Sequence, residues 1–151
     1  MTADANFDGE YEPSKWDWVA EQVERYESTN GAEAATLRDS GLPIIVMTTV
    51  GHNSGKVRKV PLMRVEHEGE YAVIASVGGR PSNPGWYHNL VANPKVLIQD
   101  GPAPFETEVR IVDGEERAAW WERAVAAYPP YAEYQAKTDR VIPVFISRAV
   151  G

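Results

Sequence analysis

The sequence contains no cysteine, and its three histidines, His52, His67 and His88, are scattered along the chain. A disulfide framework and a thiolate zinc site are therefore excluded, and we expect no metal site. No hydrophobic run approaches the 18 or more residues that a membrane span needs. The N-terminal residues are acidic where a signal peptide is basic, so we expect a protein of the cytoplasm or of the membrane periphery, without stable membrane insertion.

Positive charge is also scarce, because 15 lysines and arginines face 22 acidic residues and the formal net charge is −7. Nucleic acid requires a basic surface, so the composition disfavours such a partner. Residues 41–65 nevertheless contain no acidic residue, whereas residues 1–33 are strongly acidic. The cations of this basic segment are Lys56, Arg58, Lys59 and Arg64. The pattern is typical either of a site for a small anionic ligand or of a solvated strand face, and charge alone does not separate the two.

The length of 151 residues, with 43% hydrophobic and 25% charged residues, is that of one globular domain. Residues 1–12 are poor in hydrophobic residues and rich in charge, which predicts a disordered N-terminal tail. Residues 13–151 are expected to form a single domain that begins with a helix.

The hydrophobic pattern predicts an N-terminal helix over residues 13–29, with a capping box formed by Ser14 and Asp17. Asn83 is the expected N-cap of a second helix, and Asp113 with Glu116 is expected to cap a third that breaks at Pro129. The predicted helices lie at 13–29, 83–94 and 113–138. The predicted strands lie at 43–50, 57–68, 70–77, 95–100, 105–113 and 141–148. Because helices and strands do not alternate, the order favours an α+β protein, an antiparallel six-stranded barrel flanked by helices.

Tryptophans and helical stripes indicate the core. The stripe Trp16, Val19, Val23 and Tyr26 is expected to face the sheet from the first helix, as is the stripe Ala118, Trp121 and Val125 from the third. Trp18 and Trp120 are likewise expected in the core. Tyr128, Tyr131 and Tyr134 are spaced three apart, so they are expected to share a helix face, either as packing residues or as hydroxyl donors.

The segment TTVGHNSGKVRK, from Thr48 to Lys59, is the first candidate for an anion site. It is not a phosphate-binding loop of the nucleotide triphosphatase type, because only three residues lie between Gly51 and Gly55, where that motif has four, and a valine follows Lys56. A glycine-bounded turn can instead direct backbone amides at an anion, with Ser54 and Arg58 adding side-chain donors. The alternative is a plain hairpin turn with exposed cations.

A second segment, IASVGGRPSNPGWYHN, leaves a strand through two glycines and enters a helix. The amino end of a helix carries a partial positive charge and favours an anion or a polar ring edge. If the strands 57–68 and 70–77 pair through a turn at Glu68-Gly69, this helix start lies beside the turn at 51–56. Two converging donor sites favour anion binding over a plain turn.

Several blocks of the chain together resemble the deazaflavin (F420)-dependent nitroreductase family. The blocks are IVMTTVGHNSGKVRKVPL, VIASVGG, NPGWYHNLVANPKV and YPPYAEYQAKTDRVIPVF, in order and at matching spacing over about residues 36–147. The resemblance implies a split β-barrel related to FMN-binding and pyridoxamine-oxidase-like proteins. It also implies coenzyme F420 as cofactor, held with its phosphate and glutamyl tail over basic residues.

Residue roles follow from the resemblance position by position. The implied cofactor-binding residues are His52, Asn53, Ser54, Lys56, Arg58, Lys59, Val60, Pro61, Leu62, Met63, Ala75, Ser76, Val77, Gly78, Gly85, Trp86, Tyr87, His88, Asn89 and Tyr131. Tyr131, which is expected to cover the ring, and Ser76 are the implied catalytic residues. Met63, Trp86, Tyr128 and Tyr134 are the implied substrate-binding residues.

The implied activity is hydride transfer from reduced deazaflavin to a small, hydrophobic, conjugated acceptor, such as a quinone, an enone or unsaturated lactone of the coumarin type, or a nitro compound. The family often has basic residues where this chain has His52, Asn53 and Val77, which predicts a weaker anion site. An FMN-dependent oxidoreductase of the same barrel class and a non-catalytic F420 carrier or sensor remain as alternatives. The chain is expected to be a monomer or a homodimer.

Overall fold

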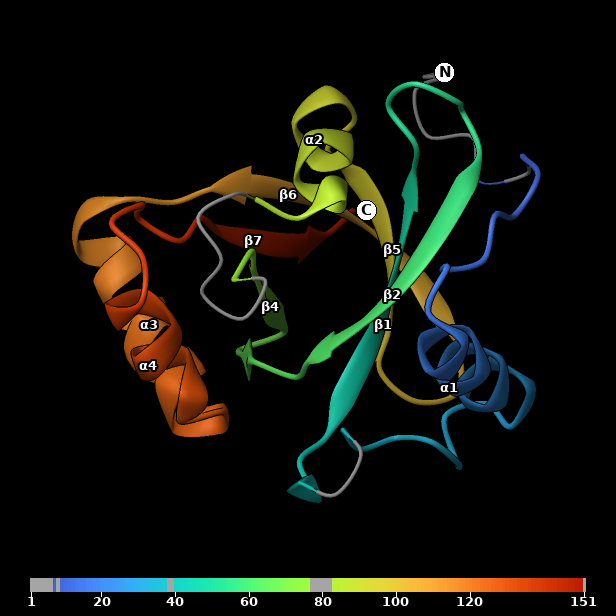
Figure 1. Cartoon of the computed structure of the whole chain (residues 1–151), viewed down its shortest axis with the longest axis horizontal. Helices are drawn as coiled ribbons and strands as arrows, with labels where there is room; N and C mark the ends of the chain where they lie inside the picture. The colour runs from blue at the N-terminus through green and yellow to red at the C-terminus, as the bar shows by residue number, and fades with distance from the viewer. Residues whose placement is uncertain (1–6, 8, 38–39, 77–82, 151) are drawn as a thin grey trace.

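A curled antiparallel sheet forms the centre of the computed structural model, which describes residues 7, 9–37, 40–76 and 83–150. Its seven strands follow the order β2-β1-β5-β6-β7-β4-β3 (Figure 1). They are β1 (Ile44–Val50), β2 (Val57–Met63), β3 (Glu66–His67), β4 (Glu70–Ile74), β5 (Lys95–Gln99), β6 (Pro104–Ile111) and β7 (Val144–Ala149). The sheet remains open between its edge strands, as a split barrel does, so the predicted fold class is confirmed.

Four helices flank the sheet within the described residues. They are α1 (Asp17–Ser28), α2 (Gly85–Ala92), α3 (Gly114–Ala127) and α4 (Pro130–Ala136). Figure 1 shows α3 and α4 together on one side of the molecule, α1 on the opposite side near β2, and α2 near the tip of the β1–β2 hairpin. None of the helices in the described ranges has the length and apolarity to cross a membrane.

Strand pairing confirms the two predicted turns but corrects one predicted pairing. β1 and β2 pair over their whole length, with Thr48 opposite Lys59. The turn at Glu68-Gly69 has φ angles of +52° and +83°, as a tight hairpin requires, yet it joins only the two-residue β3 to β4. β4 then pairs with β7. The predicted strand 57–68 is therefore divided after Met63, and the barrel is split between the edge strands β2 and β3.

Alternate residues of β1 enter two apolar clusters, as the two-residue period of a strand dictates. Ile44 and Val46 join the first cluster, which contains Val23 and Tyr26 of α1 together with residues of α3 and α4. Ile45 and Met47, on the other face of β1, join the second cluster, which packs against α2. β1 is thus held from both sides, and the turn that follows it starts from a fixed position.

Two predicted core residues lie at the surface. Trp16 and Trp18 are 64% and 36% exposed. Trp16 occupies the N-cap position before α1 begins at Asp17, and Trp18 lies in the first turn of α1, whose buried residues are Val23 and Tyr26. The hydroxyl of Ser14 accepts a hydrogen bond from Trp16 N, so the predicted capping box does not form. α1 buries Val23 and Tyr26 instead, as its stripe predicts.

The buried face of α3 is displaced from its predicted position. Trp120 and Ala124 are buried, whereas Ala118 is exposed. Trp121 and Val125 pack only at the border of the first apolar cluster. Asp113 occupies the predicted N-cap position, but its side chain makes no capping hydrogen bond, so the predicted box with Glu116 does not form. The Glu116 carboxylate instead pairs with the guanidinium of Arg110 on β6, 2.6 Å away.

The start of α2 differs by one position from the prediction. Pro84 is the N-cap, and the Asn83 side-chain oxygen accepts a hydrogen bond from Arg140 at 2.9 Å. Arg140 also donates to the carbonyl oxygens of Ala75 and Ser76. This arginine therefore links the end of the β4 segment to the start of α2.

Residues 9–14, here called the N-terminal strap, lie along the open edge of β2 (Figure 1). Val57 N donates to Glu10 O at 2.8 Å, and Glu12 N donates to Val57 O at 2.9 Å. Tyr11 thereby forms a parallel bridge with Val57. Glu10–Glu12, at the end of the predicted tail, thus have backbone hydrogen bonds to β2, because an edge strand offers free amides and carbonyls to a passing segment.

Candidate functional site

A groove of about 470 Å³ lies between the N-terminal strap, the β1–β2 turn and the start of α2. Its predicted lining residues are His52, Asn53, Ser54, Arg58, Lys59, Val60, Gly85, Trp86 and Asn89. The volume is within the roughly 300–1,000 Å³ typical of small-molecule sites. The two segments singled out in the sequence, the glycine-bounded turn and the helix start, therefore share one cavity.

The β1–β2 turn bonds three of its amides internally and a fourth, that of His52, to Asn89 of α2. Gly51 N donates to Lys56 O at 2.8 Å, and Gly55 N donates to Gly51 O at 2.9 Å. Lys56 N donates to the Ser54 hydroxyl oxygen at 3.1 Å. Among the described residues, this leaves the amides of Asn53 and Ser54 without an acceptor. The predicted nest is thus reduced to two amides, and the Ser54 hydroxyl remains able to donate.

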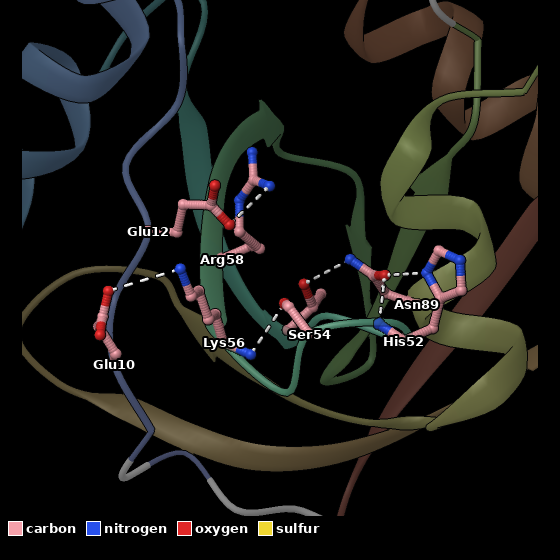
Figure 2. Close-up of polar contacts among 8 residues, drawn as sticks. Glu10, Glu12, His52, Ser54, Lys56, Arg58 and Asn89 are labelled. Carbon is pink, nitrogen blue, oxygen red and sulfur yellow. Dashed lines mark hydrogen bonds and ion pairs between the residues drawn. The ribbon is translucent and has the colours of Figure 1, made fainter.

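Asn89 fastens α2 to this turn (Figure 2). Its side-chain oxygen accepts a hydrogen bond from His52 N at 2.9 Å and lies 2.7 Å from His52 Nδ1. Because an amide oxygen only accepts, this contact assigns the imidazole proton to Nδ1. The side-chain nitrogen of Asn89 donates to the Thr49 hydroxyl at 3.4 Å. Asn89 is only 7% exposed, so this residue holds the two walls of the groove together.

Two cations, Arg58 of β2 and Lys56 of the preceding turn, meet carboxylates of the N-terminal strap (Figure 2). Glu12 lies 3.5 Å from Arg58, and Glu10 lies 3.6 Å from Lys56. The side chains of Arg58 and Glu12 are both 40% exposed. Arg58 and Glu12 both line the groove, so its main cation already has an anionic neighbour.

Lys59 is paired more tightly than Arg58. Its ammonium group lies 2.7 Å and 2.9 Å from the two carboxylate oxygens of Glu27 on α1, and 5.0 Å from the centre of the Tyr11 ring. Burial and the Glu27 charge raise the pKa of Tyr11, so its phenol stays neutral. Because Glu27 neutralises Lys59, Arg58 is the cation better able to receive an anion.

Several residues that the resemblance assigns to the cofactor do not line this groove. Lys56 pairs with the strap, Met63 is buried in the first apolar cluster, and Ala75 is buried in the second. The others that do not line it are Pro61, Leu62, Ser76, Tyr87 and His88. Val77 and Gly78 lie outside the described residues.

The three tyrosines form one cluster, as their spacing predicts. The Tyr128 and Tyr134 hydroxyls are 3.1 Å apart, and the Tyr131 ring centre lies 5.0 Å from that of Tyr128. Tyr131 is only 5% exposed within the first apolar cluster, and burial, followed by its tyrosine neighbours, raises its pKa. The hydrogen bond to Tyr128 raises the pKa of Tyr134 to about 12.

This tyrosine cluster does not line the groove. Figure 1 shows α4 well separated from the β1–β2 turn. In this conformation the hydroxyls predicted for proton donation, those of Tyr131 and Ser76, are therefore not among the groups brought together around Arg58.

Five lining residues were not predicted from the sequence: Glu12, Ser14, Val19, Thr49 and Gly51. Thr49 and Gly51 adjoin the predicted turn. The strap residues and Val19 reach the groove only because residues 9–14 pair with β2 and α1 packs beside it. The acidic composition of residues 1–33 beside a basic segment is the one sequence signal that could have indicated this contact.

The donor set suits a ligand with an anionic end and a flat, partly apolar body. Arg58, the Ser54 hydroxyl and the amino end of α2 lie at one groove, and guanidinium and helix amides are strong partners for phosphate. Val60 and Trp86 provide apolar walls in the same cavity.

Comparisons with known proteins identify the family and support the fold. A family model described as F420H(2)-dependent quinone reductase matches residues 18–149. The chain is 33% identical over 124 residues to an F420H(2)-dependent quinone reductase of Mycobacterium tuberculosis, which covers 80% of this chain and 83% of that protein. It is also similar to the solved structure of the F420-H2 dependent reductase FDR-A, with 58% identity, a TM-score of 0.67, and coverage of 70% of this chain and 94% of that one. A structure described as a domain-swapped dimer shows 52% identity and a TM-score of 0.70, with coverage of 89% and 100%.

Proposed function

Since the chain belongs to the F420H(2)-dependent quinone reductase family, we propose that it reduces quinones with reduced coenzyme F420 bound in the groove. The observation that supports this placement is the convergence of Arg58, Ser54 and the start of α2 on one cavity. The resemblance of the sequence to F420-dependent reductases and the family match point to the same cofactor.

The groove residues fit the two ends of such a cofactor differently. Arg58 and Ser54 can donate to a phosphate oxygen, with the amides of Asn53 and Ser54 beside them. Val60 and Trp86 can pack against a ring. When bound, the deazaflavin supplies a hydride and favours two-electron over one-electron chemistry. The contribution of the chain is then position, charge and exclusion of water from the ring face.

Reduction of a quinone also requires a proton. His52, Asn53 and Ser54 are exposed, so the groove opens to solvent at this wall. Solvent at the mouth of the groove can therefore supply the proton to the quinolate oxygen that hydride transfer leaves, while the covered face of the ring stays dry. The roles predicted for Tyr131 and Ser76 as proton donors remain proposals, since both residues lie outside the groove. A conformation that brought α4 towards the cofactor would be required for Tyr131 to act.

We propose further hydride acceptors on the same chemical grounds, although the family name supports only quinones. An enone, an unsaturated lactone of the coumarin type or an aromatic nitro compound is also flat and conjugated, and each accumulates negative charge on oxygen as a hydride arrives. Groups able to donate to such an oxygen would therefore assist each of them.

The first test measures equilibrium binding of oxidised coenzyme F420 to the wild-type protein and to Arg58→Ala. Hydrogen bonds to charged groups contribute about 1.5–3 kcal/mol, so the substitution should weaken binding about 10- to 150-fold. Arg110→Ala is the matched control, because Arg110 is also an exposed strand arginine paired with a glutamate. Equal affinity of wild-type and Arg58→Ala proteins would contradict the proposed anion site.

A second measurement separates the alternatives. Stopped-flow oxidation of reduced coenzyme by menadione, with and without the protein, reports turnover. Binding of the coenzyme without faster oxidation would support the carrier or sensor. The absorbance spectrum of the purified protein tests the FMN-dependent alternative, since a band near 450 nm is typical of oxidised flavin. Coumarin and a nitroaromatic compound in the same assay rank the acceptors.

We also propose that the chain forms a homodimer. The support is the relative described as a domain-swapped dimer, which is 52% identical and matches over its full length. Light scattering during size-exclusion chromatography tests this directly, and a monomer mass over the whole concentration range would contradict it.

A further inference from the structure

Two carboxylates of the N-terminal strap contact the cation of the proposed cofactor site and the lysine next to that site. Glu12 contacts Arg58 inside the groove, and Glu10 contacts Lys56 beside it (Figure 2). A carboxylate and a phosphate present similar oxygen acceptors to a guanidinium. The strap therefore places anions of this chain where anions of a ligand are expected.

The strap is held there by its backbone as well as by its charges. The hydrogen bonds of Glu10 and Glu12 with Val57 fix its register along β2. A Cβ atom added at Gly9 would lie 2.9 Å from the carbonyl oxygen of Gly55, so the close approach of the strap to the turn requires glycine at this position. This register directs both carboxylates at β2.

We propose that Glu10 and Glu12 are specificity-determining residues that compete with the anionic end of the coenzyme for Lys56 and Arg58. This inference rests on the proposed function. A ligand with a phosphate displaces the strap carboxylates when it binds, whereas a neutral ligand leaves the strap in place. The strap thereby lowers the affinity of the site for the coenzyme and excludes anions that bind Lys56 and Arg58 more weakly than the strap carboxylates do.

The geometry of the ion pairs favours displacement. Both strap pairs are long, at 3.5 Å and 3.6 Å, and their side chains are at least 40% exposed. Exposed pairs of this kind are weak, whereas a bidentate contact between arginine and phosphate is stronger and directional. The pair between Lys59 and Glu27 is shorter and more buried, so it stays intact and serves as an internal comparison.

The experiment compares Kd values for oxidised coenzyme F420 in the wild-type protein and in Glu10→Gln/Glu12→Gln. Removing two weak competing pairs should tighten binding about three- to twenty-fold. Glu115→Gln/Glu122→Gln is the control, because both residues are exposed on α3 and the change in net charge is identical. Urea unfolding of each variant verifies that it is folded.

Unchanged or weaker binding by the strap variant would overturn the inference. If the wild-type protein binds the coenzyme and Arg58→Ala weakens this binding, the proposed function stands even when the strap variant has no effect. If no folded variant binds the coenzyme, the proposed function itself fails, and the inference fails with it.

Trypsin cleavage after Lys15 gives a readout independent of affinity. Cleavage requires the neighbouring strap to leave β2, since proteases act on locally opened chain. Cleavage at this site should be faster in Glu10→Gln/Glu12→Gln than in the wild-type protein. Coenzyme should accelerate cleavage of the wild-type protein, and protection by coenzyme would show that the strap clamps the ligand, which overturns competition.

Discussion

Replacing Asn89 by alanine should destabilise the protein and also loosen the contact between α2 and the β1–β2 turn, the two walls of the groove. The substitution removes the hydrogen bond to His52 N at 2.9 Å, the contact with His52 Nδ1 at 2.7 Å and the longer bond to Thr49 at 3.4 Å. Each good hydrogen bond contributes about 1 kcal/mol net. Water can reach the exposed His52 but reaches Thr49 less easily, because Thr49 is 2% exposed.

The free energy of unfolding should therefore fall by about 2–3 kcal/mol, a large part of the roughly 5–15 kcal/mol that stabilises a domain. At about 2–4 °C per kcal/mol for a chain of this size, Tm should fall by about 4–12 °C. Urea unfolding followed by tryptophan fluorescence measures the change, since the sequence has five tryptophans.

Asn89→Asp is the matched variant, because a carboxylate can still accept both hydrogen bonds from His52. It should retain more than half of the stability that Asn89→Ala loses. Its negative charge beside the anion site should nevertheless weaken coenzyme binding. A loss of less than about 0.5 kcal/mol in Asn89→Ala, the range of ordinary surface substitutions, would refute the role of Asn89 as the link between α2 and the turn.

Two further predictions concern stability. Burial and the hydrogen bond to Asp100 raise the pKa of Tyr71 to about 12 from its ordinary value of 10. The stability that neutral Tyr71 contributes is therefore complete below about pH 10 and is lost as the pH rises towards 12. In urea unfolding at several pH values, Tyr71→Phe should lose less stability between pH 10 and 12 than the wild-type protein. An equal loss in the two proteins would contradict the raised pKa of Tyr71. Gly31→Ala should destabilise by about 2–4 kcal/mol, because Gly31 has φ +80° and an added Cβ would lie 2.6 Å from the Gly101 carbonyl oxygen. Gly41→Ala, at φ +70° in open space, should cost only about 1–2 kcal/mol, and equal losses of Tm in the two variants would argue against the steric reason.

Local pattern was sufficient for the elements that build the groove. The glycine-bounded turn and the helix start after Asn83 were both predicted, because turn residues and helix-start residues act over a few positions. Ser54 and Arg58 then followed from the donor chemistry of the turn, and Trp86 was implied by the family resemblance. Helix faces were less predictable: α3 buries Trp120 rather than Ala118, because the approach of a helix to the sheet depends on the neighbouring elements.

The sequence by itself determined the positions of the strands apart from the division of residues 57–68, the antiparallel class, the two donor segments and the family, since each is carried by short runs of neighbouring residues. Only the tertiary structure decided that Glu12 lies against Arg58, 46 residues away, that Glu27 neutralises Lys59, and that Tyr131 is buried apart from the groove. The physical reason is that charge pairing and burial depend on distance in space. That distance was set when the strap paired with the open edge of β2 and when α3 and α4 packed on the far side of the sheet.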